Sequence, residues 1–280
     1  MASLKEVKGR IASVNNTRKI TSAMKMVASA KLHKAQAAIE SMLPYERRLH
    51  HILTDFMSNC TEVTSPFIVK REVKKVAVVV FASNTGLCGG FNANVIRHLV
   101  DLLTEYKPLG LENILVFPVG KKVADAVRKL GFRIEGDFQH MADKPSYQEA
   151  ADLAADLMKR FLHGDVDKVE LLYNHFKSTA SQILTRETYL PIDLNNEKKE
   201  EERTIDYILE PSAEELMQEM LPKVLRMKMF TVLLDSNAAE HAARTMAMQI
   251  ATDNANELLQ ELTVMYNKSR QQSITNELLD

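Results

Sequence analysis

LDSNAAEHAARTMAMQIATDNANELLQELTVMY (residues 234–266) is the stretch that decides the fold. Apolar or small residues recur along it in steps of three and four, a spacing typical of a helix that pairs with another helix. Neither Gly nor Pro follows Pro222, so we expect one helix over 211–280, about 100 Å long at 1.5 Å per residue. Such a helix is longer than a compact domain of this mass. The series consists of Leu234, Ala238, His241, Thr245, Met248, Thr252, Ala255, Leu259, Leu262 and Tyr266.

A second long helix is expected over residues 1–58, where Gly9 and Pro44 are the only helix breakers. Its apolar residues fall first at Leu4, Val7, Ile11 and Val14, and then at the displaced positions Ile20, Met24 and Val27. This displacement predicts an apolar stripe that drifts around a nearly straight helix. We expect Pro44 to bend or interrupt the helix, because proline lacks a backbone donor and clashes with the preceding turn.

Charge and residue size favour antiparallel pairing of these two ends. Residues 1–50 contain ten Lys/Arg and three Asp/Glu, whereas residues 212–280 contain six and ten. Opposite net charges favour association, although each exposed pair contributes only about 0–1 kcal/mol. Small residues such as Ala23, Ala28 and Ala30 would let the helices approach closely.

Residues 73–210, between the helices, have the pattern of an α/β domain. KKVAVVVFAS (74–83) and ENILVFPVG (112–120) read as strands, and a helical pattern follows each of them. This order predicts parallel strands. A helix at 147–162 and strands at 166–173, 182–190 and 204–209 would complete a small mixed sheet. The expected organisation is therefore a helix over 1–58, an inserted α/β domain over 73–210 and a helix over 211–280.

Composition excludes several classes of protein. The net charge of −1 argues against a nucleic-acid binder, which would be clearly basic. Cys60 and Cys88 match no metal or redox spacing and cannot form a disulfide framework. The longest strongly apolar run, 76–82, is far shorter than a membrane span, and the first residues lack the apolar segment of a signal peptide. We therefore expect a soluble, untargeted chain.

The strongest lead for ligand chemistry is the turn Gly86-Leu87-Cys88-Gly89-Gly90, which lies between a predicted strand and a predicted helix. Neither G-x-G-x-x-G nor G-x-x-x-x-G-K-[ST] is present, so a tight structural turn is favoured over a phosphate site. The histidines show no metal-binding spacing, and the carboxylates and nucleophiles suggest no catalytic set. The sequence therefore predicts no catalytic residue, no cofactor and no metal. His241 is the one histidine placed on the predicted helix seam.

The methionines of the two terminal helices allow two interpretations. Met24 and Met26 lie on the first helix, and Met246 and Met248 lie on the last. They could fill a core, or they could form a flexible thioether surface that slides against several partner conformations.

Four segments carry a resemblance to a known family, namely IASVNNTRKITSAMKMVASAK (11–31), ASNTGLCGGFN (82–92), EHAARTMAMQIATDNA (240–255) and YNKSRQQSITNEL (266–278). With these segments the whole chain resembles the gamma subunits of F-type rotary ATP synthases, and the absence of a presequence suggests the bacterial type. Asn84-Thr85 replaces the acidic-basic pair usual in that family. The resemblance implies a long antiparallel α-helical coiled coil with a Rossmann-like α/β domain inserted between its two helices.

The resemblance further implies a non-catalytic rotor shaft that couples proton flow through the c-subunit ring to ATP synthesis or hydrolysis in the beta subunits. The helix pair would occupy the alpha–beta hexamer, and the α/β domain would bind epsilon and the c ring at the cytoplasmic face of the bacterial plasma membrane. Contacts with the beta or alpha subunits are implied for Met24, Lys25, Arg244, Arg270, Gln271 and Thr275. Contacts with the c ring are implied for Leu209 and Glu210.

Two other functions remain compatible with the residues alone. A nucleotide-binding α/β enzyme with helical arms would bind its ligand at Gly86–Gly90 and would be active in isolation. A cytoplasmic coiled-coil adaptor would bind its partners stably without any ATPase subunit.

Overall fold

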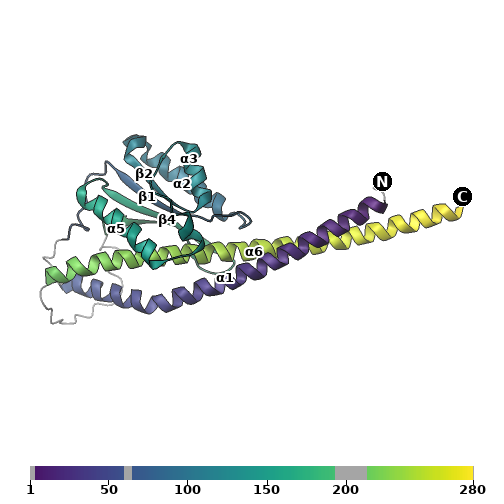
Figure 1. Ribbon diagram of the computed structural model, residues 1–280, viewed down its shortest axis with the longest axis horizontal. Helices are drawn as coiled ribbons and strands as arrows, with labels where there is room; N and C mark the ends of the chain where they lie inside the picture. The colour runs from purple at the N-terminus through teal and green to yellow at the C-terminus, as the bar shows by residue number, and fades with distance from the viewer. Residues whose placement is uncertain (1–3, 60–64, 193–212, 280) are drawn as a thin grey trace.

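The computed structural model describes residues 4–59, 65–192 and 213–279. Two long helices dominate it: α1 (Leu4–Asn59) and α6 (Ala213–Leu279). They run side by side in opposite directions, so that the two ends of the chain lie at the same end of the molecule, and the α/β domain sits against the other half of α6 (Figure 1). This confirms the predicted antiparallel arrangement. Pro44 does not interrupt α1, which continues through it.

The register of the coiled coil, the paired parts of α1 and α6, follows from contacts across it. The hydroxyls of Thr21 and Thr252 are 2.8 Å apart, and Arg18 donates to Asn256 Oδ1 at 3.3 Å. Farther along, the buried side chains Leu32 and Ala35 of α1 pack in one cluster with alanines of α6. The α6 series predicted from its three-four spacing is buried or half-buried throughout its length, and its members Ala238 and Thr252 contact α1.

The predicted drift of the α1 stripe is wrong. Ile20 and Val27 are 60% and 59% exposed, whereas the buried face continues in strict three-four steps through Thr21 and Ala28. This face also contains the half-buried Arg18 and Lys25, so packing on α6 rather than hydrophobicity decides which side of α1 is buried. Of the three alanines expected to permit the approach, Ala28 is buried, whereas Ala23 and Ala30 are exposed.

The α/β domain contains a five-stranded mixed sheet with the strand order β3-β2-β1-β4-β5. The strands are β1 (Val76–Phe81), β2 (Ile114–Val119), β3 (Arg133–Ile134), β4 (Lys168–Phe176) and β5 (Gln182–Leu190). The first four in this order pair in parallel, and β5 pairs antiparallel with β4. The predicted mixed sheet is confirmed, and the two-residue β3 adds to it. The strand predicted at 204–209 lies outside the described residues.

Helices cover both faces of this sheet (Figure 1). On one face, α2 (Phe91–Tyr106) and α3 (Lys121–Leu130) pack on Val76, Val78 and Val80 of β1. The alternate residues Ala77 and Val79 point to the opposite face, as expected for a strand. That face is covered by α4 (Gln139–Asp143), α5 (Tyr147–His163) and the first half of α6, and two short 3₁₀ turns (Lys107–Leu109, Leu111–Asn113) precede β2.

Helix α6 is thus part of two structures. Met217, Leu221, Leu225, Met229 and Leu233 belong to the core of the α/β domain, and from residue 238 the same helix forms the seam with α1. Two polar contacts hold α6 against the α/β domain. The Tyr189 hydroxyl donates to the Leu225 carbonyl at 2.7 Å, and Asn237 donates to the Ala142 carbonyl at 2.8 Å. Because no linker separates the domain from the coiled coil along α6, a force applied to one is transmitted directly to the other.

Candidate functional site

The turn at Gly86–Gly90 packs against α6. Gly89 has a φ of 60°, a conformation that glycine adopts most readily, and a Cβ added there would lie 3.8 Å from the Cβ of Ala247. The turn is also tied to β1, because Asn92 Nδ2 donates to Ser83 Oγ at 2.7 Å and Ser83 Oγ donates to the Thr85 carbonyl at 2.6 Å. These contacts support the interpretation of Gly86–Gly90 as a structural turn.

Arg244 joins this turn to the coiled coil. From α6, its Nη2 donates to Thr85 Oγ1 at 2.9 Å and to the Gly86 carbonyl at 3.3 Å, while its Nη1 forms an ion pair with Glu240. The side chains of Arg244 and Glu240 are only 11% and 8% exposed. Arg244 is therefore not a solvated helix arginine, and most of its hydrogen-bonding capacity is used inside the chain.

The preceding residue, Asn84, holds the neighbouring loops together. Its amide nitrogen donates to Asp143 Oδ2 at 2.7 Å and to the Gln139 carbonyl, and its oxygen accepts from the Lys121 backbone N–H at 2.8 Å. Asn84 and Thr85, which replace the acidic-basic pair usual in gamma subunits, thus both make structural contacts. Together with Arg244 they form what we call the junction, defined as Asn84, Thr85, Gly86, Glu240 and Arg244.

Burial shifts the ionisation of two neighbouring residues on α6 in ways that favour their neutral forms. Burial raises the pKa of Glu240, and the adjacent Arg244 opposes this shift. Burial, reinforced by the positive charges of Arg244 and Lys31, lowers the pKa of His241 to about 4. Nδ1 of His241 has no hydrogen-bond partner in the described part of the chain. His241 is therefore neutral at pH 7, and its protonation opposes folding.

We predict that the stability of the chain falls as the pH drops from about 6.5 to about 4, partly because of His241. Its unfolded-state pKa is higher than its folded-state pKa, so the unfolded chain binds the proton more readily in this window. The His241→Gln variant should remove roughly 2–3 kcal/mol of the pH dependence of the unfolding free energy. Urea unfolding of both chains at pH 7 and pH 4.5 tests this, with the exposed His33→Gln as control. An equal pH dependence in His241→Gln and the parent would contradict the assignment.

The residues that the resemblance implies as beta or alpha contacts do not form a single cluster. Met24 and Lys25 are half-buried on α1, and Arg270, Gln271 and Thr275 are exposed near the end of α6. Arg244 and Arg270 are 26 residues apart in one helix, or about 39 Å along its axis. The C-terminal turns of α6 extend past the start of α1, where they form a single projecting helix (Figure 1).

Exposed apolar side chains lie around the rod, and sequence reasoning anticipates only part of them, since it offers Met26 and Met246 as a possible partner surface but places Ile20 and Val27 on the buried stripe. We call Ile20, Met26, Val27, Met246 and Ile250 the outer apolar residues. The sequence contains a signal for their exposure, because these positions lie outside the three-four series that forms the seam. Met248 is buried in the seam whereas Met26 and Met246 are exposed, so the two interpretations of the methionines apply to different residues.

The described residues show neither a metal site nor a membrane-spanning helix. Across 4–59, 65–192 and 213–279, no group of three or more His, Cys, Asp or Glu side chains is placed to hold a metal ion. Within the same ranges, the helices lack a stretch long and apolar enough to cross a bilayer. Leu209 and Glu210, the implied contacts with the c ring, lie outside the described residues.

Comparison with known proteins agrees with this geometry. The family model described as ATP synthase matches residues 3–280. The chain is 81% identical to the ATP synthase gamma chain of Phocaeicola vulgatus, with 100% of this chain and 98% of that protein covered. It is 62% identical to the ATP synthase gamma chain of Bacteroides thetaiotaomicron, again over 100% of this chain and 98% of that protein.

Solved structures share the fold at low sequence identity. The rotor of the Euglena gracilis mitochondrial ATP synthase in rotational state 1 includes a chain with a TM-score of 0.63 and 19% identity, over 97% of this chain and 98% of that one. A chain of the Tetrahymena thermophila mitochondrial ATP synthase central stalk and c ring has a TM-score of 0.56 and 23% identity. The match covers 83% of this chain and 99% of that one. With its two terminal helices, its inserted α/β domain and its full-length match to these relatives, the chain belongs to the ATP synthase gamma chain family.

Proposed function

We propose that this chain is the central rotor shaft of an F-type ATP synthase. In this role it catalyses no reaction itself but couples proton flow through the c ring to ATP synthesis or hydrolysis in the beta subunits. The observation that best supports the proposal is the sharing of α6 between the α/β domain core and the coiled coil. A shaft must transmit torque from a driven end to a working end, and a continuous helix packed into both ends does this without a hinge.

The proposed partners are those that the resemblance to gamma subunits of F-type ATP synthases implies. The coiled coil would lie inside a hexamer of alpha and beta subunits, and the outer apolar residues of α1, which are Ile20, Met26 and Val27, would face its inner wall. The α/β domain would bind epsilon and stand on the c ring, with Leu209 and Glu210 at the ring. This arrangement places the chain at the cytoplasmic face of the bacterial plasma membrane, as a peripheral subunit present once per complex.

The coupling requires that the rod present a different face to each beta subunit. A partner conformation can shift only if the contacts of its two states differ in free energy, and a change from 1:99 to 99:1 requires about 5.5 kcal/mol. Charge-assisted hydrogen bonds of about 1.5–3 kcal/mol each are sufficient in small number. We propose Lys25, Arg270 and Gln271 as donors of such bonds, with Met24 and Thr275 as neighbouring contacts. Arg244 acts mainly by holding the Gly86–Gly90 turn against α6, and only its small exposed part reaches a partner.

The two alternatives make different predictions about purification. A tagged chain isolated from native membranes should elute with alpha, beta and epsilon, at one shaft per three beta subunits. Elution as a stable complex without ATPase subunits would favour the adaptor. Turnover of a nucleotide by the isolated chain would favour the enzyme, although the Gly86–Gly90 turn lacks both phosphate-binding glycine motifs.

Arg270→Ala should lower the rate of coupled ATP synthesis by about tenfold or more without lowering assembly of the complex. The loss corresponds to one charge-assisted hydrogen bond, and assembly is spared because Arg270 is exposed on α6. Synthesis in inverted vesicles, normalised to the amount of assembled complex, measures the effect. Lys268→Ala is the matched control, since Lys268 is exposed two residues away on a different face of α6. Equal losses of synthesis and assembly in Arg270→Ala would indicate a structural role instead.

A further inference from the structure

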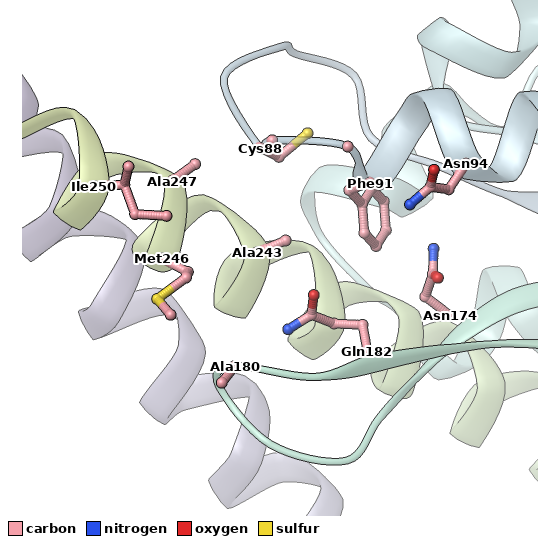
Figure 2. A pocket seen from close by; sticks show the side chains of 12 residues that line it. Cys88, Phe91, Asn94, Asn174, Ala180, Gln182, Ala243, Met246, Ala247 and Ile250 are labelled. Carbon is pink, nitrogen blue, oxygen red and sulfur yellow. The ribbon is translucent and has the colours of Figure 1, made fainter.

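A cavity of about 410 Å³ lies where the α/β domain meets α6. Three parts of the chain line it: the start of α2 with the preceding Gly turn, the hairpin between β4 and β5, and one face of α6 (Figure 2). Its volume is within the range of pockets that bind small molecules. The proposed rotor function assigns this cavity no role.

Apolar side chains line the cavity from two sides. Phe91 comes from the first turn of α2, and Met246 and Ile250 come from successive turns of α6 (Figure 2). Met246 and Ile250 are also among the outer apolar residues, and their exposure reflects the opening of the cavity to solvent. An apolar group bound here would be removed from water on several sides, which is favourable in proportion to the area buried.

Beside Phe91, and across the cavity from Met246 and Ile250, lies a buried hydrogen-bond donor without an acceptor (Figure 2). Asn174, on β4, is 4% exposed, and its Nδ2 has no hydrogen-bond partner in the part of the chain that the structure describes. Figure 2 shows this amide nitrogen directed toward Phe91 and Asn94. Buried donors are nearly always paired, because an unpaired one loses its hydration without compensation. The Asn174 amide is therefore suited to donate to a bound acceptor.

A second, independent feature at the same place also favours an acceptor. Helix α2 is 16 residues long and begins at the cavity, and its first turn has no side-chain cap. The N-terminus of a helix carries a partial positive charge and backbone N–H groups that attract anions. Arg97 donates to Asn94 Oδ1 at 2.6 Å, which leaves the Asn94 amide nitrogen to serve a ligand.

The residues that line the cavity limit the charge that a bound molecule can carry. No Lys, Arg, Asp or Glu is among the described residues that line the cavity. A doubly charged phosphate would therefore lack a counterion there, whereas a single negative charge matches the α2 N-terminus and two amide donors. We propose that this cavity binds a small amphipathic monocarboxylate. Its carboxylate accepts hydrogen bonds from Asn174 and Asn94, and its apolar body packs on Phe91, Met246 and Ile250.

The test uses the full-length chain with ¹³C-methyl methionine and 4-phenylbutyrate as the probe. The Met246 methyl resonance should shift saturably on titration, while the resonance of the seam residue Met248 should move less. The neutral analogue 4-phenylbutanamide, which has the same body but no charge, should bind about tenfold more weakly. Absence of a saturable Met246 shift up to the solubility limit of the probe would overturn the proposal. Equal binding of the amide would overturn the assignment of a carboxylate.

Two variants locate the ligand. Asn174→Leu removes the unpaired donor at similar volume and should weaken binding of 4-phenylbutyrate by about tenfold. Ala247→Leu inserts a larger side chain into the cavity from a partly exposed position and should abolish binding. Val264→Ala, elsewhere on α6, is the control that should bind like the parent. If Asn174→Leu fails to fold, the result with Ala247→Leu tests the site by itself. A folded Ala247→Leu chain that binds 4-phenylbutyrate with the affinity of the parent would refute the site.

Discussion

Covalent attachment of this chain to a beta subunit should abolish steady-state ATP hydrolysis by the assembled complex. A rotor must present its faces to all three beta subunits in turn, and a bond to one of them prevents further rotation after at most part of a cycle. Met26 is the best site for the link, because its side chain is 65% exposed on the coiled coil. The Met26→Cys chain, with Cys60→Ser and the buried Cys88 retained, would be labelled with a thiol-directed photo-cross-linker, assembled and illuminated.

The matched control is a cross-link within the shaft. Thr21 and Thr252 face each other across the seam, with their hydroxyls 2.8 Å apart, so Thr21→Cys and Thr252→Cys can form a disulfide between α1 and α6. Both helices turn together in a rotor, and this bond should leave hydrolysis unchanged. Undiminished steady-state hydrolysis in the Met26-linked complex would refute rotation, whereas a single turnover without multi-site turnover would support it.

The largest effect on stability is expected for Arg244→Ala, which should lower the free energy of unfolding by about 3–5 kcal/mol. The substitution leaves the carboxylate of Glu240 buried without its partner, and it also removes the donors to Thr85 and Gly86. Arg244→Lys keeps the charge but not the planar fork, so its loss should be smaller. Urea unfolding of the full-length chain measures both variants.

A double variant separates the cost of the unpaired carboxylate from the loss of contacts. Arg244→Ala combined with Glu240→Gln should be more stable than Arg244→Ala alone, since no buried charge is then left unpaired. Arg10→Ala is the control, because Arg10 pairs with Glu6 on the exposed surface of α1 and its removal should cost less than about 1 kcal/mol. A loss in Arg244→Ala no greater than in Arg10→Ala would show that the junction does not stabilise the fold.

The α6 seam illustrates what could be predicted from the sequence. Its spacing of three and four residues is a local property of the chain, and every position from Leu234 to Leu262 in the series is buried or half-buried as expected. The same reasoning failed on α1, where Ile20 and Val27 were chosen because they are apolar. Hydrophobicity of single residues does not decide which face of this helix is buried, since the face that packs on α6 includes Thr21 and Ala28 and leaves Ile20 and Val27 exposed.

The junction could not be predicted, because its members are far apart in sequence. Thr85 and Arg244 are separated by 159 residues, and no spacing rule relates them. The sequence places Arg244 on a helix, and the resemblance implies for it only a contact with another subunit. Only the docking of the Gly86–Gly90 turn on α6 supplies the acceptors that bury its guanidinium.

The sequence by itself determined two long helices, the mixed sheet between them and the antiparallel pairing of the ends. These features follow from periodicity, strand propensity and turn residues, which act over a few neighbouring positions. The tertiary structure alone decided which face of α1 is buried, that α6 serves both the coiled coil and the domain core, and that a cavity lies beside Asn174. Each of these depends on close packing between remote segments, where side-chain volume and hydrogen-bond pairing across the contact outweigh local preference.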